Sequence, residues 1–509
     1  MSQHRLVIKD AARQLIGRVL SWLLGFVVIK IMSPYLGPLR FGDYSTVMKY
    51  FAIRSALADF GLYVIAIRQL GLTKELEESG KVAKWSLAHE YGKFVGARFL
   101  SIIIVYTMAI VLAYFLPAYT SNPYLIRWLP LWMIFSATFM ASGIAQIPLQ
   151  LFWKMEKLSM ALVLARIRQI GLLVAVIYRW YKGVDFTSGS SVSIVAFMLI
   201  IASVVLSATA QRRHVQWSAN RLLPFRIIFD RSFIKNIYKN NRQYGIAYYL
   251  SSFHTLIVLI LLSNFFPTAQ GNIYTGIWAL ALALIEILLI IPSSLGNSLI
   301  HKIAWYSHTH MRMSFGNLLS LIYWIGGIIF INFWLFADPI IAIVGGETYL
   351  GTSLLNPGAN QILPFLAWVL RLSFGKQVFN YLFVAIEKNN DIFRVNLVGV
   401  VIGLGVGLYT IPKYHLLWWI ITQVVLEVLY FAGALCIAWY HKTMPFLSIK
   451  KIGYVTLVCG LITSITRYLT QHTIRHTRNF LWVALVLNSI LIAVSYPTIK
   501  KFARGLVVE

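Results

Sequence analysis

The sequence predicts an all-α, polytopic membrane protein with about fourteen transmembrane helices. Of its 509 residues, 59% are hydrophobic and only 12% are charged. A soluble chain has roughly 25% charged residues, so this chain cannot cover itself with a water-compatible surface. Apolar stretches of about 20 residues, long enough to cross a bilayer as a helix, recur along the whole chain. This composition excludes a soluble enzyme, a disordered protein and a fibrous repeat.

The apolar stretches are predicted to be helices, because a helix satisfies its own N–H and C=O groups in lipid. A transmembrane barrel would show alternating segments of about ten residues, and the sequence has none. The first stretch is interrupted by Arg18 and Lys30 and lacks a small-residue cleavage site, so it is expected to stay as a helix. The predicted spans are residues 11–32, 44–69, 91–116, 128–151, 161–180, 191–210, 243–266, 273–299, 315–337, 359–386, 395–411, 416–440, 452–470 and 479–499.

The basic residues predict the orientation. With the N-terminus in the cytoplasm, about 26 lysines and arginines lie on the cytoplasmic side and about 8 on the outer side. Both termini are therefore predicted to be cytoplasmic, in a multi-pass protein of the cell membrane. The net charge of +28 is spread between apolar segments, whereas a nucleic-acid-binding protein would gather its charge on one soluble face. No nucleic-acid partner is expected.

The longest predicted loop, residues 211–242, carries eight basic residues and separates two sets of six helices. One interpretation is a positive-inside loop with a surface helix built on Phe225, Ile228 and Phe233. The other is the linker between two six-helix halves, as in many secondary transporters. The predicted domains are an N-terminal lobe over residues 1–220, a C-terminal lobe over 221–440 and two extra helices over 441–509.

The sequence has no motif of a hydrolytic or redox enzyme: H-E-x-x-H, a Walker A loop, a nucleophile elbow and C-x-x-C are all missing. A membrane glycosyltransferase or polymerase would present its site on a large external loop, but residues 337–358 hold only Asp338 and Glu347 as acidic groups. Cys436 and Cys459 lie in apolar runs and are predicted to be packing residues. The sequence therefore favours transport, with no cofactor and no metal site.

Ionisable residues inside the predicted spans are the candidate site. A charge in the hydrocarbon region costs at least about 2.5–3.5 kcal/mol and normally faces a cavity or a partner. Arg18 lies about 10 Å and Arg54 about 15 Å from the cytoplasmic ends of their helices, while Lys30 and Lys49 lie nearer the outer face. The remaining cavity candidates are Arg371, Lys376 and His254, and the candidates for ion pairing or coupling are Asp59, Glu286 and Glu427.

Each candidate has a structural alternative. For Arg18 and Arg54 it is an ion pair with Asp59; Asp59 is five residues after Arg54 and points elsewhere on the helix, so an Arg18–Asp59 pair is better placed. His254 is more often a satisfied polar residue on a helix interface. An interfacial anchor is favoured for four arginines near the predicted cytoplasmic ends, which are Arg68, Arg98, Arg166 and Arg168.

The sign of the deep charges is informative, because cations outnumber carboxylates in the predicted spans. A proton- or sodium-driven drug exporter would be expected to place carboxylates centrally. Guanidinium and ammonium groups instead suit an anionic substrate, for which phosphate is the obvious group.

Residues Ala12–Gly71 contain GRVLSWLLGF, YLGPLRFGDYS and LADFGLYVIAIRQLG. This stretch resembles the start of the bacterial Wzx-type oligosaccharide flippases of the multidrug/oligosaccharidyl-lipid/polysaccharide (MOP) exporter superfamily. Residues 271–300 and 336–355 resemble that family's seventh-to-eighth-helix region and ninth-to-tenth-helix loop. The family's LG-x-x-x-FG-x-Y turn and D-x-G-L-like stretch match Leu36, Gly37, Phe41, Gly42, Tyr44, Asp59, Gly61 and Leu62.

The resemblance implies two six-helix lobes facing each other across a central cavity, as in MATE transporters and lipid II flippases, plus two extra helices. Related lipid II flippases carry essential arginines in helices 1 and 2, at places comparable with Arg18 and Arg54. Many relatives have an acidic residue in helix 7 where this chain has His254, so the family's ion coupling is not carried over.

The implied function is to flip a polyprenyl-pyrophosphate-linked oligosaccharide to the outer leaflet by alternating access. The implied partners are that lipid-linked glycan, membrane lipids and a polysaccharide polymerase. If the lobes rock, residues 36–44 and 266–272 should approach each other on the outer side in one state. The alternatives are a multidrug or small-ion exporter of the same fold, and a membrane glycosyltransferase or polymerase.

Overall fold

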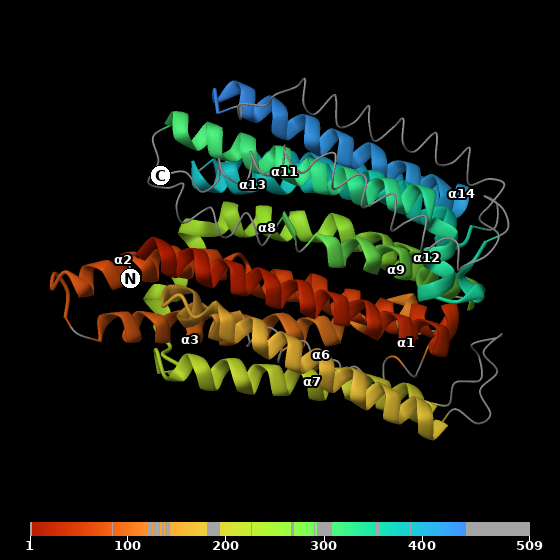
Figure 1. Cartoon of the computed structure of the whole chain (residues 1–509), viewed down its shortest axis with the longest axis horizontal. Coiled ribbons are helices and arrows are strands. Elements are labelled where there is room, and N and C mark those ends of the chain that lie inside the picture. Colours follow the sequence, from red (N-terminus) through yellow and green to blue (C-terminus); the bar gives the residue numbers. More distant parts are fainter. Residues whose placement is uncertain are drawn as a thin grey trace. The chain divides into compact units, whose positions relative to one another are not determined.

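The computed structural model describes the chain as an assembly of α-helices (Figure 1). Within the described residues there is no β-strand. The described residues are 3–83, 85–120, 143–180, 194–224, 226–265, 269–289, 291–292, 308–351, 357–386 and 388–443, with isolated positions between 122 and 137. The helices are α1 (Gln3–Asp59), α2 (Leu62–Glu78), α3 (Ser86–Ala113), α4 (Pro117–Thr120), α6 (Met155–Trp180), α7 (Ile194–Asn220), α8 (Arg231–Phe265), α9 (Ala269–Leu288), α11 (His308–Leu335), α12 (Ala337–Val344), the 3₁₀ turn η1 (Glu347–Tyr349), α13 (Ala359–Ala385) and α14 (Asn389–Tyr440).

The all-α membrane class is confirmed. In the part of the chain with a described structure, nine helical stretches are long and apolar enough to cross a membrane. The first of them, Ile16–Glu78, contains the second predicted span, 44–69, and most of the first, 11–32. The last two predicted spans, 452–470 and 479–499, lie outside the described residues, as does part of 128–151. The count of fourteen therefore stays a prediction.

Helix α1 is interrupted at Gly37, whose φ of 64° and ψ of 171° are not helical. Glycine tolerates a positive φ at no steric cost, and Pro34 and Pro38 on either side remove two backbone donors. The second arm of α1 then runs antiparallel to α3. Three hydrogen bonds show this register: Tyr50 to the Ala109 carbonyl, Ser55 with Tyr106, and Ser101 to the Ala58 carbonyl.

Helix α14 consists of two arms that pack against each other. Tyr430 lies against Gly399, and its hydroxyl donates to the Asn396 carbonyl over 3.4 Å. Leu426 lies against Gly403. As residue numbers increase along the first arm, the residues they contact on the second arm have decreasing numbers, which is the pattern of an antiparallel helical pair. The two arms contain the candidate spans Asn390–Thr410 and Ile420–Tyr440.

The chain divides into two compact units, Met1–Gly276 and Ile277–Glu509. In the first unit α1 packs against α3, α6 and α8, and α6 packs against α7 (Figure 1). Gly245 of α8 lies directly against Phe60. Helix α8, which the sequence assigned to the second lobe, is therefore part of this unit, while the lobe boundaries at residues 220 and 440 stay a prediction.

In the second unit α13 is the central helix, since it packs against α11, α12 and α14. The core is aromatic: Phe315 of α11 and Phe374 of α13 are fully buried. Gly326 of α11 has no side chain, and this leaves room for the Phe374 ring to pack directly against it. This close packing positions the polar residues that α13 and α14 share.

Candidate functional site

Arg54 lies in the second arm of α1, next to a group of three tyrosines, Tyr50, Tyr119 and Tyr249, which we call the tyrosine box. Its guanidinium is 4.9 Å from the centroid of the Tyr50 ring, which in turn lies 5.2 Å from the Tyr119 ring. Tyr249 of α8 also lies close to Arg54. Three different elements therefore surround one cation, and none of the three side chains carries a full negative charge at neutral pH.

The charge of Arg54 is not neutralised within the described residues, where it forms no ion pair. Its Nε is buried and has no hydrogen-bond partner, although the residue as a whole is half-buried. A guanidinium in the membrane interior is costly unless it meets an anion or water. Arg54 therefore has unused capacity to bind a negatively charged group.

Asp59, the last residue of α1, forms an ion pair with Arg98 of α3. The two side chains are 8% and 6% exposed, so the interfacial anchor predicted for Arg98 is wrong. Tyr238 of α8 lies beside the pair. The sequence had pointed to Arg18 as the better partner of Asp59. Since Asp59 is held by Arg98, it is part of the packing between α1 and α3.

Asp43 is the centre of a polar cluster just after the Gly37 kink. It is 2% exposed and accepts hydrogen bonds from Asn272 of α9 at 2.8 Å, from Asn122 at 3.2 Å and from Arg40 at 3.1 Å. The backbones also touch, because Gly42 packs against the Asn272 carbonyl. Gly42 and Asp43 thus contact the start of α9 within the first compact unit, while closure of the two lobes on the outer side stays a prediction.

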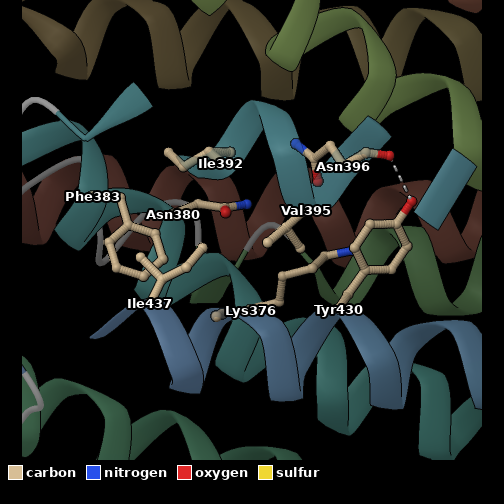
Figure 2. Close-up of a pocket in the computed structure, with 9 residues that line it drawn as sticks. Lys376, Asn380, Phe383, Ile392, Val395, Asn396, Tyr430 and Ile437 are labelled. Carbon is tan, nitrogen blue, oxygen red and sulfur yellow. Dashed lines mark hydrogen bonds between the residues drawn. The ribbon is translucent and has the colours of Figure 1, made fainter. Parts of the chain in front are cut away.

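A second buried ion pair joins α13 to α14. Lys376 Nζ lies 2.9 Å from Glu427 Oε1, and Glu427 is 2% exposed. The ammonium also lies 4.7 Å from the centroid of the Tyr430 ring. Figure 2 shows Lys376 and Tyr430 in a small pocket, with the amides of Asn380 and Asn396. Lys376, a cavity candidate from the sequence, is therefore partnered by a carboxylate.

The remaining candidates are spread over several elements. Arg371 of α13 is 7% exposed and lies 5.7 Å from the Phe330 ring. The side chain of His254 lies outside the described residues. Four others lie on helices α1 and α9, where Arg18, Lys49 and Glu286 are half-buried and Lys30 is exposed.

Sequence reasoning missed three features of these sites. It did not find the tyrosines around Arg54, the asparagines around Asp43 or the role of Arg98. Tyrosine and asparagine are uncharged, so a search for ionisable residues inside apolar spans does not select them. Asn272 is 229 residues from Asp43 in the chain, so no local spacing connects them.

The chain is similar in fold to several solved transporters. The lipid II flippase MurJ, in its inward closed conformation, is 12% identical, with 95% of this chain and 99% of that chain covered and a TM-score of 0.69. An inward-facing multidrug resistance MATE transporter of the MOP superfamily is 12% identical, with 85% and 99% covered and a TM-score of 0.55. A MOP superfamily transporter from Pyrococcus furiosus Vc1, described as having a binding pocket of reverse polarity, is 13% identical, with 89% and 96% covered and a TM-score of 0.52.

These identities establish the fold alone. Comparison with curated proteins finds no match. The sequence profile of the polysaccharide biosynthesis protein family matches residues 7–295, which is more than half of the 509 residues. Because this match covers more than half of its residues, the chain belongs to the polysaccharide biosynthesis protein family, and its fold is shared by the flippase and the transporters named above.

Proposed function

We propose that this protein flips a polyprenyl-pyrophosphate-linked oligosaccharide from the cytoplasmic to the outer leaflet of the cell membrane, for the synthesis of a surface polysaccharide. The observation that carries the proposal is Arg54, a membrane cation without an ion-pair partner among the described residues. A pyrophosphate carries dense negative charge, and a guanidinium binds phosphate oxygens through paired N–H donors. The lipid headgroup supplies the anion that Arg54 lacks.

The tyrosine box adds to the recognition. Tyr50 and Tyr249 lie beside Arg54 and restrict the positions that its guanidinium can take. A guanidinium held in a fixed orientation loses less conformational entropy when it binds an oxyanion. Arg18, on the first arm of the same helix, is the second cation assigned to the headgroup. Lys30, Lys49, Arg371 and His254 remain candidates for later steps of the path.

The main alternative is export of a drug or a small ion, which the fold also supports, since MATE transporters share it. Cationic drugs need accessible carboxylates at the centre of the membrane. Two of the three acidic candidates, Asp59 and Glu427, are instead bound to Arg98 and Lys376. This distribution of charge favours an anionic substrate.

The contact between Asp43 and Asn272 predicts a cross-linking result. With Cys436 and Cys459 replaced by serine, Asp43→Cys with Asn272→Cys should be joined by a short bis-methanethiosulfonate, because the native side chains are 2.8 Å apart. The bridge should stop translocation of the lipid-linked glycan in proteoliposomes, since it holds the outer side closed. Reduction of the bridge should restore translocation.

Asp43→Cys with Asn122→Cys is the matched control. It shares one cysteine and spans a similar distance of 3.2 Å, but both residues lie in the predicted N-terminal lobe. Its bridge should leave translocation at the level of the unbridged protein. Full translocation with the Asp43–Asn272 bridge in place would contradict alternating access at this gate, and uptake of a cationic dye in place of the glycan would favour the exporter.

The proposed orientation predicts a pattern of reporter fusions. Reporters placed after Glu509 and within residues 212–240 should be active in the cytoplasm, because the flanking segments carry the excess of lysine and arginine. Reporters placed at 345–355 should be external. Alkaline phosphatase and green fluorescent protein activities measure the two sides, and a cytoplasmic signal at 345–355 would contradict the two-lobe topology.

A further inference from the structure

Residues 226–230, just before α8, form no helix, and Ile228 among them is half-buried against α3. Ile228 points inward between Gly92 and Gly96 of α3, and its amide donates to the Gly92 carbonyl over 3.1 Å. Ile227 and Phe229 are 43% and 60% exposed. The sequence predicted a surface helix built on Phe225, Ile228 and Phe233. This is wrong for Ile228, because residues 226–230 form no helix, whereas Phe233 lies in α8.

Asp230 fixes the start of α8 just after this segment. Its carboxylate accepts hydrogen bonds from the Phe233 amide at 3.0 Å and the Ser232 hydroxyl at 2.7 Å, and it forms an ion pair with Lys93 at 3.2 Å. These donors, the Phe233 amide first, hold the pKa of Asp230 well below its usual range. Phe233 itself packs edge-on against Phe94. The segment is therefore firmly attached, and Ile227 and Phe229 are held outward.

A cationic stripe begins at the same point. Arg231, Lys235, Lys239 and Arg242 are all exposed, and their spacing of four, four and three residues places them on one face of α8. The following residues, 243–266, contain no Asp, Glu, Lys or Arg. The stripe thus ends where the apolar part of the same helix begins.

The dimensions of α8 place the stripe at a membrane surface. The helix has 35 residues, or about 52 Å, whereas the hydrocarbon core is about 30 Å thick. Its charged end must project into and beyond the headgroup layer. Trp217, which is 54% exposed, lies at the end of α7 with the Arg221 guanidinium 3.7 Å from its ring centroid. An exposed indole beside cations is typical of the membrane interface.

We propose that this surface, formed by Trp217, Ile227, Phe229 and the stripe of Arg231, Lys235, Lys239 and Arg242, binds the headgroups of anionic phospholipids. The cations meet the lipid phosphates, while Ile227 and Phe229 enter the interface beside them. We place these phospholipids in the cytoplasmic leaflet, and this step rests on the membrane orientation given with the proposed function. Lipid fits better than nucleic acid or an acidic protein, because the stripe adjoins a span and its apolar neighbours face outward.

The test is lipid binding to the purified full-length protein, measured by native mass spectrometry with phosphatidylglycerol and phosphatidylcholine. The wild type should bind phosphatidylglycerol more tightly, and this preference should weaken as ionic strength rises. The variant Lys235→Gln with Lys239→Gln should lose affinity by about fivefold per residue. Its affinity for phosphatidylcholine should not change.

Lys81→Gln with Lys154→Gln is the matched control, because both lysines are exposed and lie elsewhere in the first unit. It changes the net charge equally and should keep the wild-type preference. Equal losses in both variants would overturn the proposal, as would a wild type without any preference. Tighter binding of a ten-nucleotide single strand, lost in the same variant, would also overturn it. Arg54→Ala should keep the lipid preference, so a failure of the flippase proposal is distinguishable.

Discussion

Replacing Arg54 with alanine is expected to abolish translocation of the lipid-linked glycan while leaving the amount of protein in the membrane unchanged. The substitution removes a cation that no described carboxylate balances, so no ion pair among the described residues is lost. It also removes two charge-assisted hydrogen bonds to phosphate, each of about 1.5–3 kcal/mol. A loss of about 3 kcal/mol or more slows translocation by about 100-fold or more.

Accumulation of the lipid-linked glycan and the membrane level of the protein measure this prediction. Arg54→Lys should keep partial activity, because the charge remains but the planar fork is lost. Arg18→Ala is expected to behave like Arg54→Ala. Arg394→Ala is the matched control, since Arg394 is a surface arginine with a 78% exposed side chain, and it should translocate normally. A fall in the level of Arg54→Ala that Asp59→Asn repairs would contradict a substrate-binding role.

Replacing Arg98 with alanine is expected to give the opposite pattern, with a large loss of protein. Asp59 would remain buried without its partner. Breaking a buried ion pair from one side costs about 3–5 kcal/mol, which is a large part of the stability of a typical domain. The protein should unfold at a lower temperature and be degraded in the cell.

Adding Asp59→Asn to Arg98→Ala should restore much of the protein level, because the uncompensated charge is then gone. Thermal unfolding in detergent and immunoblotting of membranes follow the two variants. The same Asp59→Asn substitution should not restore translocation to Arg54→Ala. This crossed design separates the structural arginine from the binding arginine. A stable Arg98→Ala protein would show that the pair contributes little to the packing of α1 on α3.

Several properties followed from the sequence because they depend on composition along the chain. Hydropathy reports which segments are apolar enough for lipid, and the nine membrane-length stretches among the described residues agree with it. Counting residues along a predicted span also gives the expected depth of a side chain in the membrane, and this count led to the prediction that Arg54 is a cation inside the membrane. A resemblance carried by the Gly37 turn and the Asp59 stretch led to the family that residues 7–295 confirm.

Depth along a helix does not say which way a side chain points, and there the tertiary structure decided. The same depth argument that identified Arg54 as a deep cation predicted that Arg98 is an interfacial anchor. It missed the ion pair between Arg98 and Asp59, because the rotation of α3 that brings the two side chains together is set by packing. Ile228 is apolar whether it faces lipid or the glycines of α3, so its contact with these glycines followed only from the fold.

The sequence by itself determined that this chain is an all-α membrane protein with an excess of cations inside its spans, because the cost of placing polar groups in lipid acts on each segment separately. Only the tertiary structure decided which cations are neutralised. Arg98 and Lys376 meet carboxylates from other helices, whereas Arg54 meets tyrosines. Pairing is a property of two helices at a fixed distance and rotation, and residues far apart in the chain reach that geometry only when the helices pack.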